Sequence, residues 1–220
     1  MTPAEWQTVD VAAGSSLWRH HNSNYAADTL RPAHPNPTGR FDCPDPDGWA
    51  SSYYAFTTRV AVGETLLRDV AVSANAVNPR RLAGSSVSRV VVTNELRLVD
   101  LRGAAAWGPL NNDLSLLGFP SDNDAGLYAR ARDAAADIRA KAPQTNGLCW
   151  YSARDSSQES LLLWGDDENA SLTVAEIVPI TEAEFGAIAS LLAAWAVPLM
   201  AGDDIVDPDD VQAGILGWTS

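Results

Sequence analysis

The sequence has few of the residues on which disulfide-stabilised and metal-binding proteins depend. It contains two cysteines, Cys43 and Cys149, and three histidines among 220 residues. Two cysteines cannot form a disulfide framework, and we expect both thiols to be reduced. The potential ligands that cluster in the sequence, His20, His21, His34 and Cys43, match no zinc spacing, so no metal site is predicted.

Basic residues are also scarce. Against 28 aspartates and glutamates there are 15 lysines and arginines, which gives a formal net charge of −13. Direct binding to nucleic acid requires a basic face for the phosphates, so this composition argues against it. A few focused arginines could still hold an anionic small molecule. Any link to DNA would have to come through a basic partner protein.

Long apolar runs and familiar nucleotide-binding loops are missing as well. Residues 187–201 are interrupted by Ser190 and Pro198, so no membrane span is predicted. The N-terminus Met-Thr-Pro-Ala-Glu-Trp lacks the basic and apolar regions of a secretory signal, which predicts a cytoplasmic protein. Gly-x-Gly-x-x-Gly, a P-loop and Gly-x-Ser-x-Gly are all absent, so the sites that depend on these motifs are not predicted.

What the sequence does have is the composition of a globular domain, with 46% hydrophobic residues and eight tryptophans. β-branched or alternating runs predict strands, and apolar residues at helical spacing predict fewer helices. The predicted strands include residues 17–20, 87–92, 96–101, 148–152, 161–164 and 171–178, and the predicted helices cover 126–141 and 182–195, with a short helix or turn at 107–117. Because strands do not alternate regularly with helices, we predict a single α+β domain with a mixed, largely antiparallel sheet and flanking helices.

The predicted organisation has three parts. Residues 1–16 are polar and weakly patterned and form an N-terminal extension. Residues 17–180 form the main domain, in which residues 22–48 are a long loop rich in proline, asparagine, aspartate and glycine. Residues 181–220 form a C-terminal helix and an acidic tail, which we expect to pack on the same domain, with docking onto a second copy of the chain left open.

The stretch from Tyr53 to Glu64 is the centre of the predicted domain. A short aromatic strand leads into a helix for which Thr57 is the predicted N-cap. Helical spacing then places Glu64 on one stripe with Val60 and Leu67. An ionised carboxylate among apolar neighbours needs hydrogen-bond donors, so we expect another part of the fold, or a bound molecule, to contact Glu64.

Five polar residues at strand ends and in the long loop are the candidate site: Arg19, Arg40, Tyr53, Glu64 and Ser152. Taken singly, each has an ordinary structural explanation, such as a surface ion pair or a strand-end hydroxyl. Their order and spacing resemble the RES domain family, named for its arginine, glutamate and serine. The resemblance runs from about Leu17 to Val174. It is carried by Leu-Trp-Arg at 17–19, Gly-Arg-Phe-Asp at 39–42, the stretch 53–64, Leu-Val-Asp-Leu at 98–101 and Asn-Gly-Leu-Cys-Trp-Tyr-Ser-Ala-Arg at 146–154.

The resemblance implies a fold related to ADP-ribosyltransferase toxins and an activity that degrades NAD, which would be a substrate and not a cofactor. It also implies a toxin of a toxin–antitoxin pair whose partner is an Xre-type antitoxin that binds DNA. We therefore predict cleavage of the nicotinamide–ribose bond with water or phosphate as the acceptor. The alternatives are a protein ADP-ribosyltransferase and a non-catalytic RES-like domain that binds a nucleotide or a partner.

Each candidate residue has an expected role in that chemistry. Glu64 would stabilise the cationic transition state at the ribose. Arg40 or Arg19 would hold the pyrophosphate, and either would help to keep Glu64 ionised. Tyr53 would stack on nicotinamide or ribose, and Ser152 would hydrogen-bond a ribose or amide group.

Overall fold

An eight-stranded sheet with the order β1-β5-β6-β7-β3-β2-β4-β8 is the framework of the protein. The computed structural model describes residues 6–45, 48–67, 82–117, 126–153, 155–165, 171–181 and 187–190. The strands are β1 (Thr8–Val11), β2 (Ser16–Asn22), β3 (Ala50–Ala55), β4 (Ser85–Val92), β5 (Leu96–Asp100), β6 (Gly147–Tyr151), β7 (Glu159–Gly165) and β8 (Leu172–Pro179). The helices are α1 (Thr58–Leu66) and α2 (Leu127–Lys141), with 3-10 turns η2 (Gly103–Ala106) and η3 (Leu114–Leu117).

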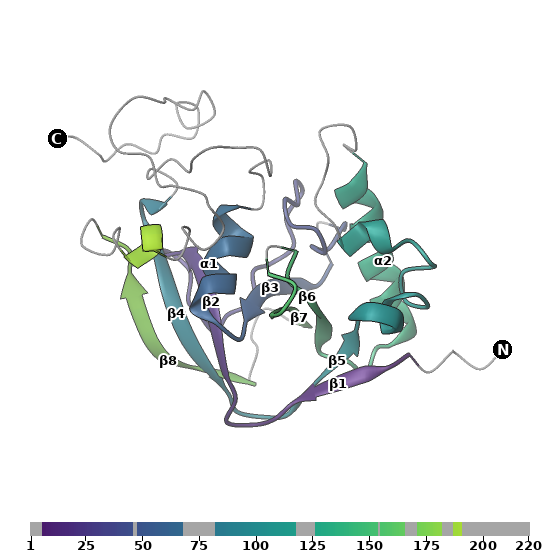
Figure 1. Ribbon diagram of the computed structural model, residues 1–220, viewed down its shortest axis with the longest axis horizontal. Helices are drawn as coiled ribbons and strands as arrows, with labels where there is room; N and C mark the ends of the chain where they lie inside the picture. The colour runs from purple at the N-terminus through teal and green to yellow at the C-terminus, as the bar shows by residue number, and fades with distance from the viewer. Residues whose placement is uncertain are drawn as a thin grey trace.

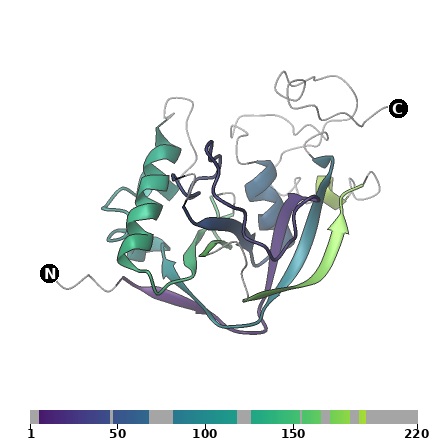
Figure 2. The same cartoon turned by 180° about the vertical axis from the view of Figure 1, so that it is seen from behind.

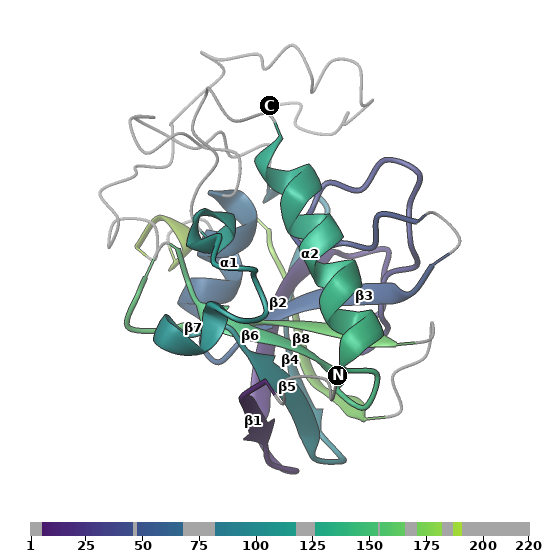
Figure 3. The same ribbon diagram turned by 90° about the vertical axis from the view of Figure 1, so that its right-hand side faces the viewer.

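The pairing confirms the predicted fold class. All neighbouring strands are antiparallel except β5 and β6, which run parallel. In Figure 1 the sheet curves strongly, with β8 and β4 on one side and β1 and β5 on the other. Figures 1 and 3 both show α1 and α2 standing on the same side of this curved sheet.

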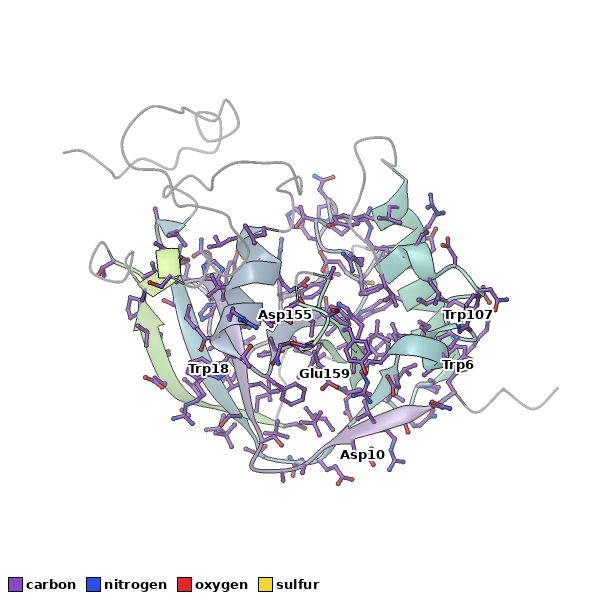
Figure 4. All side chains as sticks on the ribbon, viewed as in Figure 1. Trp6, Asp10, Trp18, Trp107, Asp155 and Glu159 are labelled. Carbon is purple, nitrogen blue, oxygen red and sulfur yellow. The ribbon has the colours of Figure 1, made fainter. Side chains whose placement is uncertain are left out.

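Strand β1 lies in the segment that the sequence pattern marks only as a polar extension. Thr8 pairs with Val99 and Val11 with Leu96, so β1 completes one edge of the sheet. Among the four residues of β1 only Val11 is buried, which explains why no alternating pattern shows in the sequence. Trp6, just before the strand, packs near Gly108, and Figure 4 shows Trp6 and Trp107 close together at that edge.

Helix α1 begins as predicted. The Thr57 side chain accepts a hydrogen bond from the Val60 amide, which satisfies one of the free donors at the helix start. Val60 and Ala61 pack against Trp18 of β2 and Ala55 of β3. The helix is therefore fixed over the place where these two strands meet.

Helix α2 covers the other half of the sheet, as its helical spacing predicts. Its buried residues join a core with the apolar side chains of β6 and β7; this core includes Leu127, Ala131, Ala135, Ile138, Leu148, Trp150, Leu162 and Trp164. The predicted short helix or turn at 107–117 is a series of turns that ends in the 3-10 turn η3. Residues 187–190, within the predicted C-terminal helix, are helical, and Ile188 is buried in a core cluster with Val62 and Leu66 of α1. Residues 182–186 and 191–220 lie outside the described residues, so the rest of this helix and the acidic tail stay predictions.

Strands β2 and β3 are neighbours that pair at a single position, Trp18 with Ala55. Beyond it, β2 pairs along its length with β4, and β3 pairs along its length with β7. We call this place the β2–β3 junction. Because the two strands diverge there, side chains of both strands can face a common space between them.

The described part of the connection between β2 and β3, residues 23–45 and 48–49, lies between the two helices when the molecule is seen from behind (Figure 2). The Arg19 guanidinium donates to the carbonyl oxygens of Ala26, Ala27 and Thr29 at 3.2, 3.1 and 2.7 Å. Arg132 of α2 donates to the carbonyl oxygen of Gly39 at 3.3 Å. The loop predicted from its composition is thus held to β2 at one end and to α2 at the other.

Candidate functional site

A cavity of about 250 Å³ lies at the β2–β3 junction. Side chains from β2, β3, β6, β7, both helices and the 23–49 connection form its wall. The residues that line it include Arg19, His20, Tyr25, Arg31, Arg40, Asp42, Tyr53, Glu64, Tyr128 and Trp150. Four of the five residues predicted from the sequence, Arg19, Arg40, Tyr53 and Glu64, are among them.

Glu64 projects from α1 into this cavity and is half-buried. The Ser152 hydroxyl donates a hydrogen bond to Glu64 Oε1 at 2.5 Å. Ser152 itself is 1% exposed, and it lies behind Glu64 and not on the cavity wall. Ser152 is therefore the hydrogen-bond donor that we expected for Glu64 among its apolar neighbours. No arginine or lysine of the described residues forms an ion pair with this carboxylate.

The loop that carries Ser152 is tied to α1 a second time. The amide of Asp155 donates to Ser152 Oγ at 3.2 Å, and the Asp155 carboxylate forms an ion pair with Arg59 of α1. Figure 4 shows Asp155 beside this helix. Hydrogen bonds from Ser157 and the Arg59 charge hold the pKa of Asp155 below its usual value. Two contacts thus fix the distance between α1 and the end of β6, where the Glu64–Ser152 pair lies.

Three arginines bring positive charge to the cavity of this acidic protein. Arg19 and Arg40 are 7% and 6% exposed, and Arg31 is exposed. Arg40 donates to the carbonyl oxygen of Leu117 at 2.7 Å, and its guanidinium lies 6.0 Å from the centre of the Tyr128 ring. Among the described residues no carboxylate forms an ion pair with any of the three. Their charges are therefore available to an anion in the cavity.

Tyr53 is held from both sides. Its hydroxyl oxygen accepts a hydrogen bond from the Phe41 amide at 2.8 Å, and its ring meets Trp150 edge-on with 6.2 Å between ring centres. A Cβ atom at Gly39 would lie 2.5 Å from the Tyr53 hydroxyl oxygen and would overlap the Asp42 carboxylate. Glycine at position 39 is therefore required for the close approach of the connection to this tyrosine.

His20 also lines the cavity and was not predicted from the sequence. Ser85 Oγ donates its proton to the carbonyl oxygen of Leu82, so it accepts from His20 Nε2 at 3.0 Å. The neutral ring is then protonated on Nε2, and Nδ1 is a buried acceptor with no partner among the described residues. Burial, and to a smaller extent the neighbouring His21, lowers the pKa of His20 from 6.5 to about 4.

This lowered pKa predicts a pH dependence of stability. Between pH 6.5 and about 4 the unfolded chain protonates His20 while the folded protein keeps it neutral. The free energy of unfolding should therefore fall with decreasing pH across this range, by up to roughly 3 kcal/mol at about 1.4 kcal/mol per pKa unit. Urea denaturation at pH 7, 5.5 and 4.5 measures this loss. The His20→Gln variant should lose clearly less free energy of unfolding over the same pH range. Identical pH dependence of the two proteins would contradict the assignment.

Sequence reasoning missed Trp150 and Tyr128 as well as His20. Trp150 stands within the segment 146–154 that carries the family resemblance, but its aromatic neighbours Phe41 and Tyr53 come from distant parts of the chain. Tyr128 lies in the first turn of α2, and the helical spacing of the apolar residues does not mark it as a site residue. Arg154, the last residue of that segment, lies outside the described residues.

The described residues place two further limits on the site. Among them, no group of three or more histidine, cysteine, aspartate or glutamate side chains is arranged to hold a metal ion. The described helices are all too short or too polar to cross a membrane.

Known proteins resemble this chain in fold and in sequence. The structure is similar to a chain of the crystal structure of the MbcT–MbcA toxin–antitoxin complex of M. tuberculosis, with a TM-score of 0.56, 16% sequence identity and coverage of 81% of this chain and 90% of that one. At this identity the likeness shows a common fold. No curated protein matches the sequence. The model of the RES domain matches residues 16–185, and the chain therefore belongs to the RES domain family.

Proposed function

We propose that this protein is an NAD-degrading toxin of a toxin–antitoxin pair, which cleaves the bond between nicotinamide and ribose. The observation that carries the proposal is the pairing of Glu64 with Ser152 at the wall of a cavity that is also lined by three arginines, none of which has an ion-pair partner among the described residues. A carboxylate beside a cationic carbon and guanidinium groups beside a pyrophosphate are the two requirements of this substrate.

The reaction follows from the charges. When the glycosidic bond breaks, nicotinamide leaves with the bonding electron pair and becomes neutral, so it needs no prior protonation. The anomeric carbon becomes oxocarbenium-like, and the negative charge of Glu64 stabilises this cation more than it stabilises the bound substrate. The oxygen of a water acceptor then bonds to the anomeric carbon and releases one proton to the solvent, whereas an anionic phosphate oxygen would bond without losing a proton. A second catalytic carboxylic acid of the kind used by most glycosidases is therefore not required.

Ser152 has a different role in this proposal from the expected contact with substrate. Its hydroxyl proton is already donated to Glu64, and its side chain is buried behind that carboxylate. We therefore assign Ser152 as a positioning residue, which fixes the orientation of the Glu64 carboxylate. Tyr53 and Trp150 offer aromatic surface for the nicotinamide ring. Arg19 and Arg40, which are buried in the same cavity wall, can hold phosphate oxygens.

The partner belongs to the same proposal. The similar structure is a toxin bound to its antitoxin, and family resemblance points to an antitoxin of the Xre type. A net charge of −13 suits binding to a basic protein, and such a partner would supply the contact with DNA.

Product analysis tests the proposed function. Purified protein is incubated with NAD, with and without inorganic phosphate, and the products are identified by mass. Free nicotinamide with ADP-ribose indicates water as the acceptor, which we expect because it needs no additional site. ADP-ribose 1″-phosphate would indicate phosphate, and label from NAD on macromolecules would indicate a protein ADP-ribosyltransferase. Intact NAD in every reaction would overturn the proposal and favour a binding domain without turnover.

A further inference from the structure

The cavity is small for the proposed substrate. Its volume is about 250 Å³, whereas pockets that bury a drug-sized ligand have volumes of about 300–1,000 Å³. NAD consists of two nucleotides and is larger than such a ligand. One of its nucleotides can occupy the cavity beside Glu64, and the other has to lie at the mouth or on the surface next to it.

Two side chains at the mouth have the chemistry to bind a second nucleotide. Tyr25 lines the cavity and is also 56% exposed, which places it at the opening. Arg31 also lines the cavity and is exposed. Within the described parts of the chain its guanidinium has no carboxylate partner. An aromatic ring and a cation without a carboxylate partner among the described residues thus both line the cavity and are exposed to solvent.

The backbone beneath both residues is fixed. The Tyr25 amide donates to the carbonyl oxygen of Asn22 at 3.1 Å, and the segment that follows is held by the three hydrogen bonds from Arg19. Arg31 and Ser51 exchange two backbone hydrogen bonds of 3.0 and 2.8 Å, which form an isolated bridge to β3. Fixed backbone reduces the entropy that a ligand must overcome when it binds at this mouth.

We propose that Tyr25 and Arg31 form a subsite for the adenylate half of NAD, with the adenine stacked on Tyr25 and a phosphate bound by Arg31. This inference rests on the proposed function. It follows from the two aromatic environments of the site: Tyr53 and Trp150 form the inner one beside Glu64, and Tyr25 forms the outer one. Adenine takes no part in the bond cleavage, so it can be bound at the solvent-exposed end, where its contribution is to affinity.

Two measurements on Tyr25→Ala and Arg31→Ala test the subsite. The first is steady-state kinetics with NAD, where we expect KM to rise about tenfold for Tyr25→Ala with kcat within about twofold of the wild type. The second is calorimetric binding of ADP, which contains adenine and the pyrophosphate but no nicotinamide. ADP affinity should fall about tenfold in both variants, and Tyr25→Phe should keep it, because the stacking face remains.

Matched controls are available on the same protein. Trp107→Ala removes an exposed aromatic ring on the turn after η2, and Arg97→Ala removes an exposed arginine on β5; neither lines the cavity. Wild-type affinity for ADP in Tyr25→Ala would overturn the subsite even if the protein consumes NAD. Conversely, a wild-type protein that leaves NAD intact would overturn the proposed function, while the ADP measurement would still decide the subsite.

Discussion

A Glu64→Gln variant should consume NAD at least roughly a hundredfold more slowly than the wild type, because it lacks the charge that stabilises the developing cation. Glutamine has nearly the shape of glutamate, and its amide oxygen can still accept the hydrogen bond from Ser152. The free energy of unfolding should therefore change little. The measurement is the rate of NAD consumption by both proteins at equal concentration, together with their urea denaturation midpoints. Expression of the variant should also fail to arrest growth in cells without an antitoxin, whereas the wild type arrests it.

The control for charge is Glu176→Gln, which removes a carboxylate from the exposed face of β8, 48% exposed, away from the cavity. It should keep wild-type turnover. Ser152→Ala should reduce kcat by about tenfold, because the carboxylate then loses the hydrogen bond that orients it. Adding Ser152→Ala to Glu64→Gln should cause little further loss, since both act through one group. A Glu64→Gln protein with wild-type turnover would eliminate Glu64 as the catalytic residue.

A Gly147→Ala variant should be severely destabilised, by more than about 3 kcal/mol, or should fail to accumulate as folded protein. Gly147 begins β6 between two partners, Leu98 of β5 and Leu163 of β7. A Cβ atom at this position would overlap the backbone carbonyl oxygen of Leu162. Backbone of a central strand cannot yield as a flexible side chain can, so β6 and β7 would have to separate. The urea denaturation midpoint, or the soluble yield, measures the effect.

Gly165→Ala is the matched control, because Gly165 ends β7 in the same half of the sheet. Among the described residues, its added Cβ would meet only the Leu30 Cδ1 atom at 3.4 Å, which is an ordinary packing distance. The control should therefore lie within about 1 kcal/mol of the wild type. A Gly147→Ala protein as stable as Gly165→Ala would show that the β6–β7 pairing differs from the one described.

The elements that could be predicted from the sequence are those whose signals are local. The apolar spacing of α2 ends just before Pro143, and Thr57 offers a side chain that caps α1. β1 has no such signal, because a short strand with one buried residue is defined by its partner β5 and not by its own pattern. The same reason explains why β4 begins at Ser85, before the β-branched run that predicts it.

The residues of the candidate site likewise fall into those that the sequence predicts and those that only the fold brings together. Family resemblance supplied Arg19, Arg40, Tyr53, Glu64 and Ser152, and the structure brings the first four to one cavity. The contact between Ser152 and Glu64 depends on how α1 lies over the end of β6. The two residues are 88 positions apart, so their spacing in the sequence does not predict this contact. Tyr25 and Arg31 stand in a loop that composition identifies only as irregular. The place of Tyr25 depends on the neighbouring carbonyl groups that Arg19 holds, and the place of Arg31 depends on its backbone bridge to Ser51.

The β2–β3 junction also determines how the protein can fold. It divides the sheet into two groups of strands, and neither group is contiguous in sequence: β2, β4 and β8 lie on one side, and β1, β3, β5, β6 and β7 on the other. The chain passes from one group to the other repeatedly, so neither can complete its pairing while the other is unfolded. Folding should then be a single cooperative transition, slow because most strand partners are distant in sequence. An incomplete chain still on the ribosome would lack β8 and with it the finished sheet, and the Glu64–Ser152 pair would form only after β6 has been synthesised.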